Sequence, residues 1–433
     1  MRLKWALMVV IVAGAFFAGG WLLRRARTTP PPIPSIGPAT SRQAGTDLFS
    51  GVFQTIKAHA VDSLGDQTIY QLATAGVLAE LGDPYALVVP GSDSGSVPAF
   101  GEPPVQGLYL DQTEGYVEVV GVIPGSPAAT AGVRPGDAVL AVDRATVERQ
   151  RADEVARMIG GSPGSTVKLR LGRESAAGGA SVTRGEVPAL IPIVVDGLDP
   201  GVARLKFSRL DSASAAAAGA ALDSLASSSR AVIIDLRGSV EGTFAGALAL
   251  AERLLEPGAT IAITRSRLGA DSIVYLDREP DAHARLAVVV LVDRSTAGPA
   301  ELLAGTLQDH DRAVVVGEAT FGRGASQSLF PLGNGSSLRL TTAVWVTPSG
   351  RVIQRFPVPE APDGTAPDSA VARPKFTTQG GRTVLGGGGI VPDREVPAGA
   401  EPSGAADPAL ALARSLIQRS KDRKGLLTVA AIP

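Results

Sequence analysis

The sequence contains no cysteine and only three histidines, His59, His283 and His310. Without cysteine there is neither a disulfide framework nor a thiolate metal site, and the scattered histidines lack the spacing of metal ligands. Lysine is rare as well, and the 41 basic and 42 acidic side chains form no long block of one sign. The sequence therefore predicts no cofactor, no metal and no nucleic-acid partner.

A long apolar run lies near the start of the chain. Trp5 to Leu23 contains no charged residue, and as a helix it measures about 28 Å, close to the roughly 30 Å hydrocarbon core of a bilayer. Arginines follow the run, and no small-x-small cleavage site ends it, so we expect residues 1–27 to form an uncleaved transmembrane signal anchor. Residues 28–46 are rich in proline, which is typical of an extended linker.

Hydrophobic periodicity divides the rest of the chain. Residues 47–92 repeat apolar side chains at helical spacing and predict a segment of two amphipathic helices. Strand and helix patterns alternate over residues 189–418, which predicts an α/β (α+β) core. Within it, residues 357–388 are rich in proline and glycine and predict a flexible insertion.

One strand-to-helix turn stands out in the predicted core. Leu286 to Val292 is an apolar, β-branched run that predicts a strand buried on both faces, and a helix starts at Pro299. The free N–H groups and the dipole at such a helix start favour a developing anion. Hydrolases therefore often place a nucleophile at turns of this kind.

The residues around this turn match, without a gap, the pattern Ser-Ala-Ser-Ala-Ser-Glu, then Gln-Asp, then Val-Gly-Glu-x-Thr-Phe-Gly-Lys-Gly-x-x-Gln. The matching residues are Glu301, Gln308, Asp309, Gly317, Glu318, Thr320, Phe321, Gly322, Gly324 and Gln327. The pattern belongs to the C-terminal processing, or tail-specific, serine peptidases, which this chain resembles from about Asp47 to Gln418. The resemblance implies the peptidase core of that family, and a location of most of the chain outside the cytoplasmic membrane.

The residues that carry the chemistry of that family differ here. By the resemblance, the nucleophilic serine falls on Gly298, the general-base lysine on Arg323, a further catalytic position on Gln327 and the oxyanion region on Gly242. Glycine has no nucleophile, and arginine stays protonated and cannot act as a base. Pro299 follows the nucleophile position and has no N–H for an oxyanion hole. We therefore expect a pseudopeptidase that keeps the fold without the Ser/Lys dyad.

Other readings of the site stay open. Ser295 or Ser326 could act as a displaced nucleophile in an active serine-type endopeptidase, with His310 as the nearest base in the sequence. A purely structural envelope protein is a third reading, and it predicts no affinity for peptides. Glu241 replaces a glycine of the oxyanion region, and we expect its carboxylate to pair with Arg323 if it turns inward.

Residues 104–175 predict a small β-rich module, whose stretch IPGSPAATAGVRPGD at 123–137 resembles the PDZ domain inserted in these peptidases. Such a domain caps the C-terminus of a peptide with backbone N–H groups, while the peptide adds a strand to its sheet. A lid or spacer is the alternative role. The predicted peptide-binding residues are Gly107, Leu108, Tyr109, Leu110, Val155 and Ile159. The partners implied by the resemblance are the C-terminal tails of cell-envelope proteins.

Overall fold

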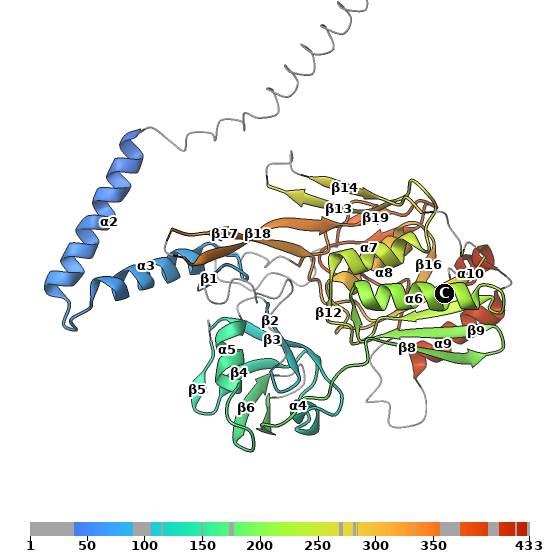
Figure 1. Cartoon of the computed structure of the whole chain (residues 1–433), viewed down its shortest axis with the longest axis horizontal. Helices are drawn as coiled ribbons and strands as arrows, with labels where there is room; N and C mark the ends of the chain where they lie inside the picture. Colours follow the sequence, from blue (N-terminus) through green and yellow to red (C-terminus); the bar gives the residue numbers. More distant parts are fainter. Residues whose placement is uncertain are drawn as a thin grey trace, which may run out of the picture. The chain divides into compact units, whose positions relative to one another are not determined.

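The structure is a computed structural model of the chain (Figure 1). It describes residues 39–89, 105–113, 116–148, 150–172, 177–267, 272–279, 283, 285–333, 335–355, 373–396, 407–420 and 422–430. The chain falls into two compact units, Met1–Glu80 and Leu81–Pro433. The predicted anchor, residues 1–27, and residues 28–38 of the predicted linker lie outside the described residues. In the described part of the chain, no helix is both long and apolar enough to cross a membrane.

The first unit contains the helices α2 (Ala39–His59) and α3 (Asp66–Glu80), so both helices predicted from the apolar periodicity are present. They pack through aromatic side chains, and the ring centroids of Phe53 and Tyr70 lie 4.9 Å apart. α2 starts inside the predicted linker. The reason is that Pro38 is the last proline there, and the residues after it keep their backbone N–H donors.

The centre of the second unit is a mostly parallel sheet. Its strands, in spatial order, are β21 (Arg394–Glu395), β16 (Ala313–Gly317), β15 (Ala287–Val292), β11 (Ala231–Asp235), β9 (Val202–Phe207) and β8 (Ile193–Asp199). Only β8 runs antiparallel to its neighbour. Every residue of β11, β15 and β16 is buried, as the run Leu286 to Val292 predicts.

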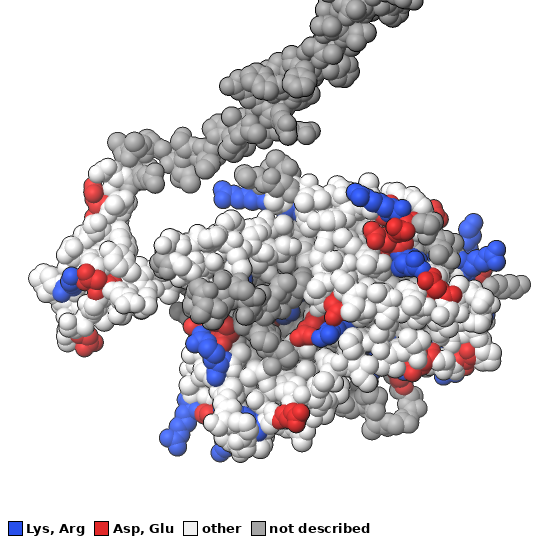
Figure 2. Space-filling model, viewed as in Figure 1, with Lys and Arg blue, Asp and Glu red and all other residues white. Residues whose placement is uncertain are grey.

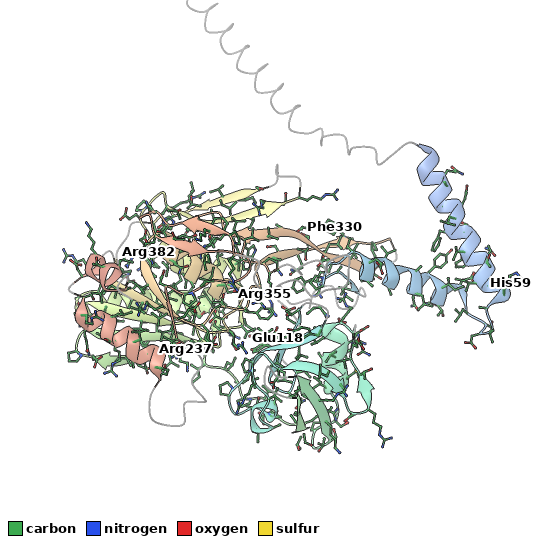
Figure 3. The ribbon with its side chains drawn as sticks, turned by 180° about the vertical axis from the view of Figure 1, so that it is seen from behind. His59, Glu118, Arg237, Phe330, Arg355 and Arg382 are labelled. Atoms are coloured by element: carbon green, nitrogen blue, oxygen red, sulfur yellow. The ribbon has the colours of Figure 1, made fainter. Side chains whose placement is uncertain are left out.

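Helices cover both faces of this sheet (Figure 1). They are α6 (Ser212–Leu225), α7 (Phe244–Glu252) and α8 (Pro299–Asp309) on one face, and α9 (Pro408–Arg419) and α10 (Arg423–Ala430) on the other. Val288 and Val290 of β15 pack with the first group, and Val289 and Leu291 with the second, because successive side chains of a strand point to opposite faces. The result is the predicted α/β core, built as three layers. Arg237 attaches α9 through its contacts with Asp407 (Figure 3).

A second, antiparallel sheet flanks this core. Its strands are β1 (Leu87–Val89), β18 (Ser337–Val346), β13 (Thr260–Ser266) and β14 (Ile273–Leu276), with β17 (Ala325–Pro331) also paired to β18. Two short pairs complete the unit: β10 (Arg209–Leu210) with β12 (Glu241–Gly242), and β19 (Lys375–Thr377) with β20 (Thr383–Leu385). The last pair lies in the predicted flexible insertion. There Arg382 bonds both Asp311 and Asp393, which gives the described residues of this Gly-rich segment fixed partners.

The β-rich module has a core of its own. Its strands are β2 (Leu108–Thr113), β3 (Tyr116–Val122), β4 (Ala138–Val142), β5 (Ala145–Thr146), β6 (Thr166–Gly172) and β7 (Ala177–Thr183), and its helices are α4 (Pro127–Thr130) and α5 (Ala152–Ile159). The sheet order β2-β3-β4-β6-β7 leaves β2 at an edge, with α5 packed against it. Leu108 and Leu110 of β2 enter the module's core, whereas Tyr109 enters a different cluster.

Candidate functional site

The turn between β15 and α8 has the sharp geometry that the sequence suggests. Gly298 has φ 62° and ψ −121°, a conformation that strains any residue with a side chain, and Pro299 occupies the first helical position. Between β15 and Gly298, the carboxylate of Asp293 fixes the backbone. It accepts hydrogen bonds from the N–H groups of Ser295 and Gly238, at 3.0 and 3.1 Å. The backbone of a strained nucleophile turn is therefore present, although position 298 carries no side chain.

Glu301 connects this turn to the loop that follows β16. Its carboxylate is fully buried and accepts the N–H of Gly298 at 2.9 Å and the N–H groups of Gly322 and Arg323 at 2.7 and 2.8 Å. The hydroxyl of Thr320 donates to the same carboxylate. Burial raises the pKa of Glu301 to about 7, although these hydrogen bonds favour the charged form. Glu301 therefore fixes the nucleophile position and the general-base position relative to each other.

The side chain of Arg323 points into the β-rich module. Its Nε and Nη2 lie 2.7 and 2.6 Å from Oδ2 of Asp111 on β2, and both side chains are almost completely buried. The hydroxyl of Tyr85 donates to the same oxygen at 3.2 Å. Burial is the largest single influence and acts to lower the pKa of Arg323, but the charge and hydrogen bond of Asp111, together with Tyr85 and Glu301, outweigh it and the pKa is raised. Arg323 is thus a permanent cation held by a carboxylate, and no base stands at this position.

This pairing differs from the one expected from the sequence. We expected Glu241 to pair with Arg323, but the cation is bound to Asp111. Burial, followed by the charge of Glu241, raises the pKa of Tyr109. No sequence signal links positions 111 and 323, which are 212 residues apart.

The module covers the turn at Gly298. Tyr109, Val120 and Ile123 form one buried apolar cluster with Val240, Ala297 and Phe321. A Cβ added at Gly121 of β3 would lie 2.6 Å from Val240 Cγ2 and 3.9 Å from Ser295 Cβ. Because this cluster includes Ala297, immediately before Gly298, apolar side chains of the module occupy the space next to the nucleophile position.

The predicted fallback nucleophiles have no base beside them among the described contacts. Ser295 is 3% exposed, and its backbone N–H bonds Asp293. Ser326 accepts the indole N–H of Trp345 at 2.7 Å. His310 follows the last residue of α8, about 16 Å along the helix from its start, and bonds the carbonyl of Thr260. The structure therefore does not bring His310 to either serine.

The two remaining residues of the predicted catalytic set, Gly242 and Gln327, have contacts with nearby backbone. Gly242 has φ 157°, and a Cβ there would lie 2.2 Å from the carbonyl oxygen of Leu210 in the adjacent strand β10. The side-chain amide of Gln327 on β17 donates to the carbonyl of Ala325 at 3.4 Å. Among the described contacts, the side chain of Gln327 forms no hydrogen bond with Arg323 or Glu301.

The predicted peptide-binding residues lie along β2 and α5. Leu108, Leu110, Val155 and Ile159 pack together in the module's core. Gly107 has φ 86° in a tight turn that also lets Leu108 donate its N–H to the carbonyl of Val105, at 2.9 Å. The side chain of Tyr109 lies on the opposite face of β2, away from this group.

The described chain also has a cavity away from the turn at Gly298. This cavity of about 440 Å³ lies at the far end of α8, lined by Pro257, Ala259, Asp311 and Gln379 among others. Among the residues with described side chains, no group of three acidic, histidine or cysteine side chains could hold a metal ion. On the face shown in Figure 2, the described acidic and basic side chains are interspersed.

Comparisons with known proteins agree with this architecture. The model of peptidase family S41 matches residues 201–371, and a PDZ domain model matches residues 118–173. The carboxyl-terminal-processing protease of Picosynechococcus sp. is 33% identical over 310 residues, which cover 69% of this chain and 73% of that protein. The carboxy-terminal processing protease CtpA of Bacillus subtilis is 25% identical over 336 residues, 77% and 72% of the two chains. The solved photosystem II D1 C-terminal processing protease has a similar fold, with a TM-score of 0.61 and 23% identity over 84% of this chain and 92% of that one.

Proposed function

Because this chain belongs to the carboxyl-terminal-processing proteases of peptidase family S41 and carries their PDZ domain, we propose that it is a pseudopeptidase which binds C-terminal tails. One observation carries the proposal. The position of the nucleophile is Gly298, and the position of the base is an arginine bound to Asp111 in the protein interior. Neither half of a Ser/Lys dyad is therefore available for acyl transfer.

Peptide binding rests on the geometry of β2 in the PDZ domain. β2 is an edge strand, so its outer backbone groups can pair with an extended peptide. The helix α5 packs against this strand, and the turn at Gly107 precedes it. These elements favour a tail that ends in an apolar residue with a free carboxylate.

The proposed location of the protein rests on its sequence. The apolar run from Trp5 to Leu23 supports a single membrane anchor, and membership of the family supports an extracytoplasmic position for the remainder. The bound tails then belong to proteins of the cell envelope. Val61→Cys tests this placement, because Val61 is fully exposed and the chain has no other cysteine. We expect a membrane-impermeant maleimide to label this variant in intact cells, and labelling only after lysis would overturn the placement.

Binding is tested with the full chain in detergent micelles. The probe is a fluorescent, unstructured peptide that ends in leucine, and the matched control is the same peptide with an amidated C-terminus. We expect saturable binding that is lost on amidation, because the PDZ turn would cap a carboxylate. No difference between the two peptides would contradict tail binding and favour a structural envelope protein.

Catalysis is tested with an unstructured protein substrate that has an apolar C-terminus. We expect no cleavage by the natural chain, at any pH between neutral and mildly alkaline. Cleavage that Ser295→Ala abolishes would instead establish the alternative, an active serine-type endopeptidase with a displaced nucleophile. The two assays are independent, so tail binding and loss of catalysis can fail separately.

A further inference from the structure

Strand β2 contacts two parts of the catalytic region. Tyr109 packs in one buried cluster with Val240, the residue before Glu241 of the oxyanion region, and Asp111 binds Arg323, which stands at the base position. Positions 109 and 111 are two residues apart on one strand, so their side chains point to the same side of the sheet. One face of β2 therefore matches two separate positions of the former catalytic region.

The pair of Asp111 and Arg323 is closed to solvent. Asp111 is 3% and Arg323 is 4% exposed, and the hydroxyl of Tyr85 donates a further hydrogen bond to the same carboxylate. A buried cation and anion persist together only when each has a partner, because either charge alone pays a large desolvation penalty. The pair is therefore specific to the closed arrangement of the PDZ domain and the core.

Around the pair of Asp111 and Arg323, the PDZ domain and the core are complementary in apolar packing and in charge. The apolar side chains Val120 and Ile123 of the PDZ domain pack against Val240, Ala297 and Phe321 of the core. Glu118 of β3 interacts electrostatically with Arg355 across the same border (Figure 3). The contact thus combines apolar packing with opposite charges in register, as protein interfaces do.

We propose that the lost catalytic positions have become an internal docking site for β2, with Arg323 as its recognition residue. This docking site deepens the proposed function and rests on it, since a working Ser/Lys dyad needs the same positions free. Its ligand is the chain's own PDZ strand. The domain is held over the turn at Gly298, while the edge of β2 and α5 remain the surface offered to a peptide.

A disulfide trap tests the closed arrangement, because the natural chain contains no cysteine. In the variant Gly121→Cys, Ser295→Cys, the two Cβ atoms would be about 3.9 Å apart, within the range of disulfides. Val240→Ala is added to make room, since Val240 Cγ2 lies 2.6 Å from the Cβ introduced at position 121. This triple variant is the parent of all variants below. We expect the full chain to form this disulfide on mild oxidation, seen as a mobility shift on a non-reducing gel. Thiols that stay free would overturn the proposal.

A double-mutant cycle in this parent then tests the recognition residue and its partner. Asp111→Asn and Arg323→Met each leave one buried charge unpaired, and we expect each to slow disulfide formation about tenfold, which corresponds to about 1.4 kcal/mol. The double variant removes both charges, so it should be no slower than the slower single variant. Additive slowing, or no slowing in either single variant, would refute the assignment of Asp111 and Arg323.

Two controls separate docking from general loss of structure. Asp196→Asn removes a carboxylate that is paired to Arg204 on β8 and β9, and it should leave the rate of disulfide formation unchanged. Arg323→Lys keeps the cation and should stay close to the parent. Circular dichroism establishes that every variant is folded. No peptide or substrate enters the experiment, so its outcome is distinct from that of the binding and cleavage assays.

Discussion

Restoring the dyad residues should not restore catalysis while Asp111 is present. Consider the variant Gly298→Ser, Pro299→Ala, Arg323→Lys, which rebuilds the residues of the family pattern. A lysine acts as a base only in its neutral form, and the carboxylate that now lies 2.7 Å from the Arg323 Nε would stabilise the charged form. An opposite charge this close raises a lysine pKa by about 1–3 units. With about 2 units added to about 10.4, the neutral fraction at pH 8 falls from roughly 0.4% to roughly 0.004%.

The assay is cleavage of an unstructured protein substrate by this triple variant, with and without Asp111→Asn. Removing the carboxylate should raise kcat/KM about 100-fold and move the alkaline rise of the pH profile down by about 2 units. Adding Asp196→Asn instead should change neither quantity, because that carboxylate is paired to Arg204 on the core sheet. Equal activity with and without Asp111, or a pH profile that does not move, would refute the reasoning.

Three further predictions concern the framework of the site. Glu301→Gln should destabilise the fold by about 2–3 kcal/mol in urea denaturation, because an amide NH₂ would face N–H donors. The pKa of Glu301 is raised to about 7, so between about pH 4.5 and 7 the folded chain holds a proton that the unfolded chain releases. The free energy of unfolding of the natural chain should therefore fall by up to about 3 kcal/mol as the pH rises through this range, and this pH dependence should vanish in Glu301→Gln. Arg237→Ala should lower the protection of α9 against hydrogen exchange by about 3 kcal/mol, because the ion pair with Asp407 is lost and the fully buried Asp235 is left without this cation; unchanged protection of α9 would contradict this. Tyr85→Phe should cost only about 1 kcal/mol in urea denaturation, because Arg323 still satisfies Asp111.

The sequence was sufficient for features that depend on local patterns. The apolar run Leu286 to Val292 predicts a buried strand, and the structure places it in the centre of the core sheet. Gly298 and Pro299 predict a tight helix start, which φ 62° and the first helical position of α8 confirm. Glu301 matched the family pattern, but only the structure shows that it holds the loop of the base position.

Features that depend on distant residues could not be predicted in this way. The partner of Arg323 was expected at Glu241 because both fall in the family's catalytic region, whereas the observed partner lies in another domain. Nothing in the sequence around Asp111 distinguishes it from a surface carboxylate of an exposed strand. The fixed partners of Arg382 in the Gly-rich segment are likewise acidic residues from elsewhere in the fold.

The backbone at position 298 makes the loss of the nucleophile hard to reverse. A serine at φ 62° and ψ −121° carries strain of roughly 1–3 kcal/mol, whereas glycine adopts this conformation without it. Exchange to glycine therefore releases strain that the fold would otherwise bear, and a return to serine restores it without any gain until the base is also present. Stability alone therefore disfavours a serine at position 298 for as long as no base stands at position 323.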